Sequence, residues 1–164
     1  MKTLKNKFAV LIIMLFAISC SNDESNSIKT PTNFSEIQLS DIIAKESQMS
    51  IADIIATNSA GIHWEPGTVF IYKTTENHYG KLELVSIDIS KNYEATFNAT
   101  NFNSDGSISN STSNLLVPGT ALVDLDAFKI HPDIKTGDLH WTRLTETDTN
   151  LAPKNGAKFY KYTF

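Results

Sequence analysis

The stretch Tyr93-Glu94-Ala95-Thr96-Phe97-Asn98-Ala99-Thr100 decides the fold, because its character alternates with a period of two. Aromatic and small apolar residues occupy the odd positions, and polar residues occupy the even ones. Successive side chains of a β-strand point to opposite faces, so this pattern predicts a strand with one buried face. The turn sequence Asn103-Ser104-Asp105-Gly106 follows and predicts a β-hairpin whose second strand runs from Ser107 to Val117.

Similar patterns recur on both sides of this hairpin. Pro118-Gly119 and Asn155-Gly156 indicate turns, because glycine permits the backbone conformations that tight turns need. Together the patterns predict a mostly β fold, a small antiparallel sandwich or barrel with turn signals roughly every 8–12 residues. We expect about seven strands, at residues 69–72, 82–87, 93–100, 107–117, 120–128, 139–145 and 157–164.

The residues before the sheet have a different periodicity. Isoleucine and leucine recur at spacings of three and four between residues 37 and 55. Ser40 and Ser50 are suitable N-cap residues, because a serine hydroxyl can accept a hydrogen bond from the first helical turn. The pattern predicts one or two short N-terminal helices, at about 36–46 and 50–57, packed against the sheet.

The N-terminus has the features of an export signal. An uninterrupted apolar run covers residues 8–18, with three lysines before it and Ser19 and Cys20 after it. The run has 11 residues, whereas a membrane-spanning helix needs about 20. A cationic start, an apolar stretch and a small residue at the cleavage point are typical of a secretory signal.

Cys20 is the only cysteine in the chain. Ile18-Ser19-Cys20 resembles the lipobox of bacterial lipoproteins, although Ala17 stands where leucine is commonest. The resemblance implies cleavage after Ser19, diacylation of Cys20 and attachment to a membrane through lipid. Ser21-Asn22-Asp23-Glu24 resembles the acidic tract after this cysteine in Bacteroidota lipoproteins, which implies transport to the outer face of the outer membrane. An ordinary acidic linker is the alternative.

These features divide the chain into three parts. Residues 1–19 form the signal peptide, residues 20–33 the lipidated cysteine with a disordered polar tether, and residues 34–164 a single β-rich domain. Removing a signal that holds three lysines and no acid changes the formal charge from −4 to −7. An acidic chain is a poor partner for nucleic acid, and acylation of the only cysteine excludes disulfides.

Two tryptophans stand beside polar groups that suit a sugar. Trp64 and Trp141 each follow a histidine, which is His140 in the second case. An indole face packs against a sugar ring while polar neighbours bind its hydroxyls. Tyr160 and Tyr162 alternate near the C-terminus and are further candidates for stacking on a sugar. For all of these residues a core position is the alternative interpretation.

Asp124 and Asp126 are two apart in a predicted strand, which places both carboxylates on one face. Such a pair can act as general acid and base, or simply mark the solvent face. No two histidines have the spacing of a metal motif, and the sequence has no nucleophile elbow or phosphate loop. The sequence therefore predicts no catalytic residue, no metal site and no cofactor.

The expected function is a non-enzymatic, lipid-anchored binding or interaction module of the cell envelope, with a glycan or a protein as ligand. A periplasmic inhibitor or immunity-type lipoprotein that blocks a hydrolase is one alternative. A small hydrolase that uses Asp124 and Asp126 is another.

Overall fold

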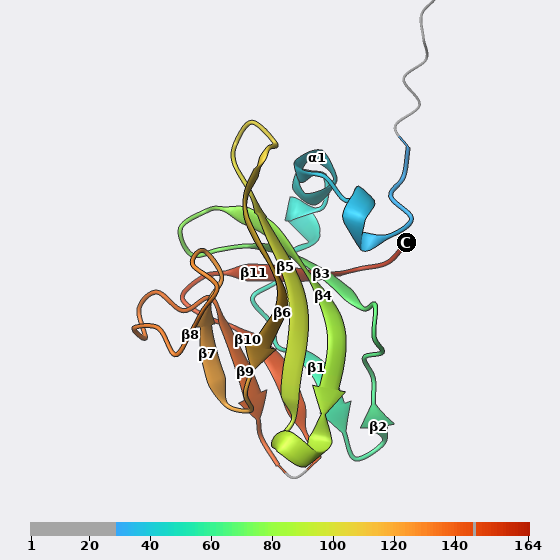
Figure 1. The fold of residues 1–164 in the computed structure, drawn as a ribbon, viewed down its shortest axis with the longest axis vertical. Coiled ribbons are helices and arrows are strands. Elements are labelled where there is room, and N and C mark those ends of the chain that lie inside the picture. The colour runs from blue at the N-terminus through green and yellow to red at the C-terminus, as the bar shows by residue number, and fades with distance from the viewer. Residues whose placement is uncertain (1–28, 146) are drawn as a thin grey trace, which may run out of the picture.

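Two antiparallel sheets pack face to face in the computed structural model, which describes residues 29–145 and 147–164 (Figure 1). The predicted signal peptide, Cys20 and tether residues 21–28 lie outside the described residues. The described residues form eleven strands: β1 (Ile54–Asn58), β2 (Gly61–Ile62), β3 (Val69–Lys73), β4 (Tyr79–Asp88), β5 (Glu94–Phe102), β6 (Ile108–Val117), β7 (Ala121–Asp124), β8 (Lys129–Ile130), β9 (Leu139–Arg143), β10 (Thr149–Pro153) and β11 (Lys158–Tyr162).

The first sheet has five strands in the order β11-β3-β4-β5-β6, and the second has six in the order β2-β1-β10-β9-β7-β8. Neither sheet closes on itself, so the fold is an open sandwich rather than a barrel. The core lies between the sheets, with Phe70, Leu84 and Phe97 from the first and Val123 and Trp141 from the second.

The stretch 93–100 forms the strand that its alternation predicts. β5 buries Ala95, Phe97 and Ala99 in the core, while Thr96 is half-buried on the other face. Tyr93 lies just before this strand with a φ of 60°, and its carbonyl accepts a hydrogen bond from Trp141 Nε1 at 2.7 Å. The predicted hairpin between β5 and β6 is also present.

The mostly β class is confirmed, but the expected number of about seven strands is too low. β1, β2, β8 and β10 are additional, and the predicted strand 120–128 breaks after Asp124, where a turn separates β7 from β8. The predicted helix at 50–57 is wrong, because residues 54–58 form β1 and pair with β10. Isoleucine and threonine, which are stiff at χ1 and fit a pleated sheet well, make up three of these five residues.

The residues before β1 cover one end of the outer face of the five-stranded sheet (Figure 1). The helix predicted at 36–46 is shorter, since α1 is Leu39–Ile43 between 3₁₀ turns at Phe34–Glu36 and Glu46–Gln48. Because this segment covers one face of β3 and the core covers the other, residues 69–72 are all buried. The apolar cluster beneath the segment consists of Ile37, Leu39, Ile42, Met49, Val69, Ile71, Phe102 and Tyr162.

The packed domain begins before residue 34. Pro31 is buried, although the sequence assigns it to the tether. The backbone N–H of Thr32 donates to Glu36 Oε2 at 2.9 Å, and Lys29 Nζ donates to Glu36 Oε1 at the same distance. These hydrogen bonds lower the pKa of Glu36 to about 2, and the one from the Thr32 backbone has the largest effect. No helix in the described residues is long and apolar enough to cross a membrane.

Lys81 joins the N-terminal segment to the sheet. This β4 residue is only 5% exposed, and its Nζ donates to the carbonyls of Phe34 and Ile37 at 2.7 and 2.8 Å. The ammonium group also lies 4.6 Å from the ring centroid of Phe34 and 5.5 Å from that of Phe102, which adds cation–π attraction. Burial lowers the pKa of Lys81, and the two carbonyls and two rings offset the cost of enclosing its charge.

We predict that Lys81→Met loosens the N-terminal segment while the sandwich stays folded. The substitution leaves the carbonyls of Phe34 and Ile37 without their donor, at a cost of about 1–3 kcal/mol. Amide hydrogen exchange should accelerate at Ile42 and its neighbours in α1, but not in β5. Lys161→Met, which removes an exposed lysine of β11, serves as the control. Unchanged exchange in α1 would show that Lys81 does not hold this segment.

Candidate functional site

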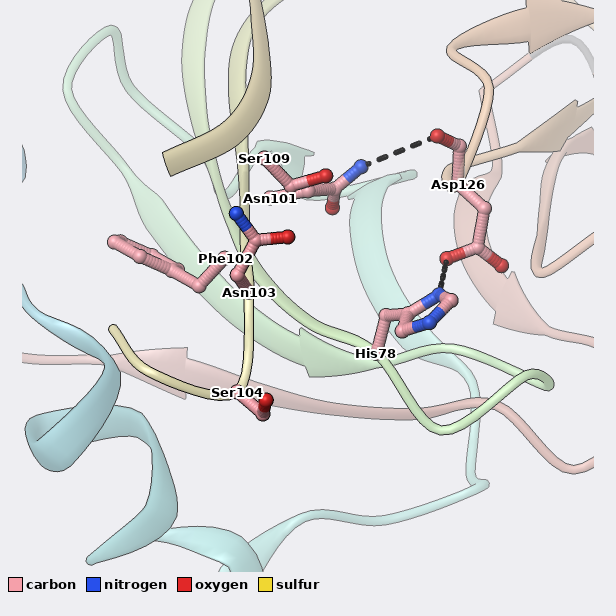
Figure 2. A pocket seen from close by; sticks show the side chains of 7 residues that line it. All are labelled: His78, Asn101, Phe102, Asn103, Ser104, Ser109 and Asp126. Carbon is pink, nitrogen blue, oxygen red and sulfur yellow. Dashed lines mark hydrogen bonds and ion pairs between the residues drawn. The ribbon is translucent and has the colours of Figure 1, made fainter. Parts of the chain in front are cut away.

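A cleft of about 330 Å³ opens at one end of the sandwich, beside the turn of the β5–β6 hairpin (Figure 2). Three parts of the chain build it: the turn before β4, the hairpin formed by β5 and β6, and the turn between β7 and β8. We call it the Asp126 cleft. Its lining residues are His78, Asn101, Phe102, Asn103, Ser104, Ser109 and Asp126.

The hairpin adopts the turn that its sequence predicts. The N–H of Asn103 donates to the Ser107 carbonyl at 2.8 Å, and the N–H of Gly106 donates back to the Asn103 carbonyl at 3.0 Å. Gly106 has a φ of 87°, a conformation that favours glycine. Asp105 Oδ1 accepts hydrogen bonds from the backbone N–H and the hydroxyl of Ser107, so the tip of the hairpin is well ordered.

His78 and Asp126 lie side by side in the lining of the cleft and point toward each other (Figure 2). His78 Nδ1 lies 2.8 Å from Asp126 Oδ1, and the side chains are 56% and 17% exposed. The backbone carbonyl of Asp126 accepts hydrogen bonds from the side-chain amides of Asn110 at 3.0 Å and Asn101 at 3.5 Å. The turn between β7 and β8 is therefore tied to both strands of the hairpin.

A buried polar chain supports the floor of the cleft. The Tyr72 hydroxyl donates to Asn101 Oδ1 at 2.7 Å, and Asn101 Nδ2 donates to the Leu125 carbonyl at the same distance. Burial raises the pKa of Tyr72 well above 10.0, so its hydroxyl remains a donor. A side chain at Gly80 would clash with the Tyr72 ring and the Asn101 amide, so this glycine provides the space that the hydrogen bond needs.

Asp138 is fully buried beside the cleft and connects its two walls. Its carboxylate accepts hydrogen bonds from the backbone N–H groups of Thr75 at 2.7 Å and Leu125 at 2.9 Å. Its own backbone pairs with the Val123 carbonyl and the Lys154 N–H. Burial raises the pKa of Asp138 above its ordinary value of 3.8, although the two amide hydrogen bonds act in the opposite direction.

Two groups of side chains in this region have ligand atoms within 4.8 Å of one another, close enough to hold a metal ion. The first group is Glu76, His78 and Asp126, and the second is Asp124, Asp126 and Asp138. In the second group Asp138 uses both oxygens for backbone amides, so we assign it a structural role.

The structure changes the interpretation of both tryptophans. Trp64 is 2% exposed and Trp141 is fully buried, with their ring centroids 5.6 Å apart in the core. Neither ring can serve as a surface platform for a sugar, because both fill the space between the sheets. The alternative of a core position is correct for both residues.

The remaining predicted site residues are scattered. Tyr162 is buried beneath the N-terminal segment, and Tyr160 is half-buried beside the same cluster. His140 lines a separate pocket of about 480 Å³ with Leu122, Ile134, Lys154 and Asn155. None of these predicted residues reaches the Asp126 cleft.

Asp124 and Asp126 do not share a strand face. Asp124 is the last residue of β7, and its Oδ1 accepts a hydrogen bond from the N–H of Ala127. Asp126 lies in the following turn and pairs with His78. Among the described residues, no hydroxyl is hydrogen-bonded to the His78 ring.

Sequence reasoning missed His78, Asn101 and Asn103 as site residues. His78 and Asp126 are 48 residues apart, and no local spacing relates them. The only available signal was the turn at 103–106, which indicated a hairpin but not what would lie beneath it.

Comparison with known proteins identifies no relative: no protein-family model, no curated protein and no solved structure matches the chain.

We predict that Asp138→Asn destabilises the fold and that the loss depends on pH. One buried N–H loses its acceptor, which costs about 1–3 kcal/mol. The folded protein binds the Asp138 proton more tightly than the unfolded chain does, because the pKa is raised in the fold. The stability advantage of the native protein over the variant should therefore grow as the pH falls through the folded pKa toward 3.8.

Urea unfolding of both proteins between pH 3.5 and pH 8 tests this prediction. Asp53→Asn, at an exposed aspartate, should change stability little at any pH. An advantage that shrinks on acidification would contradict the assignment, since that is the behaviour of a carboxylate whose pKa is lowered in the fold.

Proposed function

We propose that this chain is a lipid-anchored binding module of the cell envelope, and that its domain binds a carbohydrate in the Asp126 cleft. The observation that carries the proposal is the lining of the cleft, in which every residue except Phe102 offers a polar side chain. Its volume of about 330 Å³ is close to the lower limit for small-molecule sites.

Several groups in the cleft are free to bind a ligand. Among the described residues, Asp126 Oδ2, His78 Nε2 and the hydroxyls of Ser104 and Ser109 have no hydrogen-bond partner. Together they offer both donors and acceptors, as the hydroxyl groups of a sugar require. Asp126 itself is held in place by His78, so it is ordered before a ligand arrives.

The charge of the lining favours a neutral ligand. No lysine or arginine lines the cleft, so a phosphate or carboxylate ligand would find neither of the side chains that usually pair with such anions. A lipid is disfavoured as well, because Phe102 is the only apolar lining residue and is itself 4% exposed. A polyhydroxylated ligand suits these conditions best.

The hairpin supports a second candidate function, that of a hydrolase inhibitor. It projects beyond the sandwich, and its ordered tip carries Asp105 (Figure 1). Hydrogen bonds from Ser107 lower the pKa of Asp105, which keeps the tip negatively charged. An ordered, charged loop of this kind can enter the active site of an enzyme at a small entropic cost.

For the carbohydrate function, we predict that Asp126→Asn weakens sugar binding about 10- to 100-fold, as expected for the loss of a charge-assisted hydrogen bond. Binding is measured by isothermal titration with the best ligand from a printed array of oligosaccharides. The full chain is kept in a detergent without a sugar headgroup, so that the detergent cannot compete. Asp133→Asn, at an exposed aspartate outside the cleft, is the matched control. Binding that survives Asp126→Asn would place the ligand elsewhere.

For the anchor, we predict that Cys20→Ala moves the protein from the membrane fraction to the soluble fraction of cells that process lipoproteins. The thiol of Cys20 is the only one that could carry a thioether-linked lipid. Ser27→Ala, a nearby substitution that leaves the cysteine in place, should not change the distribution. A Cys20→Ala variant that remains in the membrane fraction would refute lipid anchoring.

Protease treatment of intact cells tests the predicted display at the cell surface. A surface protein is degraded while the outer membrane is intact. Survival until that membrane is breached would place the protein on the periplasmic side and would disfavour a role in capturing external glycans.

A further inference from the structure

Two further cavities adjoin the Asp126 cleft at the β5–β6 hairpin. The middle cavity, of about 170 Å³, lies between α1 and the hairpin, and the third, of about 340 Å³, extends along α1 toward the hairpin tip. The middle cavity shares four residues with the Asp126 cleft: His78, Phe102, Asn103 and Ser104. It shares three with the third cavity: Leu39, Ile43 and Ser104. Each cavity shares lining residues with the next, and Ser104 lines all three, so the cavities are adjacent; together we call them the groove.

The character of the groove changes along its length. Most of the residues that line the two ends have polar side chains, with Asp126 and His78 at one end and Gln38, Ser40 and Asp105 at the other. The middle is more apolar, and its lining includes Leu39, Ile43, Tyr79 and Phe102. Ile43 ends α1 and is 48% exposed, so its side chain is available to a ligand.

Tyr79 is held in position in this middle section. Its hydroxyl donates to Glu46 Oε2 at 2.7 Å, and the Lys73 ammonium lies 5.1 Å from its ring centroid. The apolar wall is therefore part of a fixed surface that joins the N-terminal segment to β4.

The charges along the groove restrict the ligands that it can bind. Asp126 and Asp105 stand at opposite ends, and no lysine or arginine lines any of the three cavities. A ligand with repeated carboxylates or sulfates would be repelled at both ends without a compensating cation. A neutral oligosaccharide, or one that carries amino groups, would not be repelled.

From the adjacency of the three cavities, the change from polar to apolar lining residues and the charges, we propose that the groove binds a neutral or amino-sugar oligosaccharide of several units, which spans all three cavities. One unit occupies the Asp126 cleft, the next packs the C–H face of its ring against Ile43, and a further unit reaches Asp105. This inference rests on the proposed carbohydrate function and extends it from a single sugar to a chain.

The length dependence of binding tests the groove. Titrations with chains of one to five units of the best array ligand should show affinity rising until the groove is filled, and then no further. The same array should show no binding of uronic-acid or sulfated chains. An affinity that does not change with length would overturn the groove and leave the single-sugar function in place. An array on which no sugar binds would overturn both the groove and the carbohydrate function.

A substitution in the middle section separates the two proposals. Ile43→Ser should weaken binding of the longer chains about fivefold, which corresponds to losing partial burial of one isoleucine, and should leave binding of a single sugar unchanged. Ile55→Ser is the matched control, since Ile55 is 53% exposed on β1 and lines none of these cavities. Equal effects of Ile43→Ser on short and long chains would contradict the assignment of a separate subsite.

Discussion

The candidate site depends on the hydrogen bonds that the buried carboxylate of Asp138 accepts. It accepts hydrogen bonds from Thr75, in the turn that leads to His78, and from Leu125, directly before Asp126. Asp138 thus positions both members of the hydrogen-bonded pair His78 and Asp126 in the cleft. Burying an aspartate is costly, and its two amide donors offset this cost only because both turns are in place. The geometry of the cleft and the integrity of this end of the sandwich therefore depend on each other.

The hydrogen bonds among Tyr72, Asn101 and Leu125 add a second connection between the sheets at the same end. Buried polar groups of this kind stabilise one arrangement over its alternatives, because any shift leaves a donor or acceptor without a partner. Apolar contacts dominate elsewhere between the sheets, and such contacts tolerate small shifts more easily. The sandwich combines a general apolar core with one end whose geometry is closely specified.

The sequence predicted those parts of the fold that depend on local pattern. Alternation from 93 to 100 indicated β5 correctly, and the turn at 103–106 indicated the hairpin. The prediction failed at 50–57, because isoleucines at 51, 54 and 55 fit a helical spacing, whereas pairing with β10 determines the outcome. The sequence left Trp64 and Trp141 open between a sugar platform and a core position, because a polar neighbour in sequence does not reveal whether an indole faces the core. His78 and Asp126 could not be paired, since that contact exists only after the two sheets meet.

The attachment of the N-terminal segment has a mechanical consequence. A force applied to the chain before Lys29 is transmitted to the domain through residues 29–37. Hydrogen bonds to Glu36 and from Lys81 hold these residues in place. The next element along the chain is α1, whose Leu39 and Ile43 form a wall of the groove. Tension that separates Phe34 and Ile37 from Lys81 would carry this wall away from the hairpin. A ligand that bridges α1 and the hairpin would resist the same movement. Force on the N-terminal chain would therefore weaken ligand binding in the groove, and a bound ligand would make the segment harder to detach.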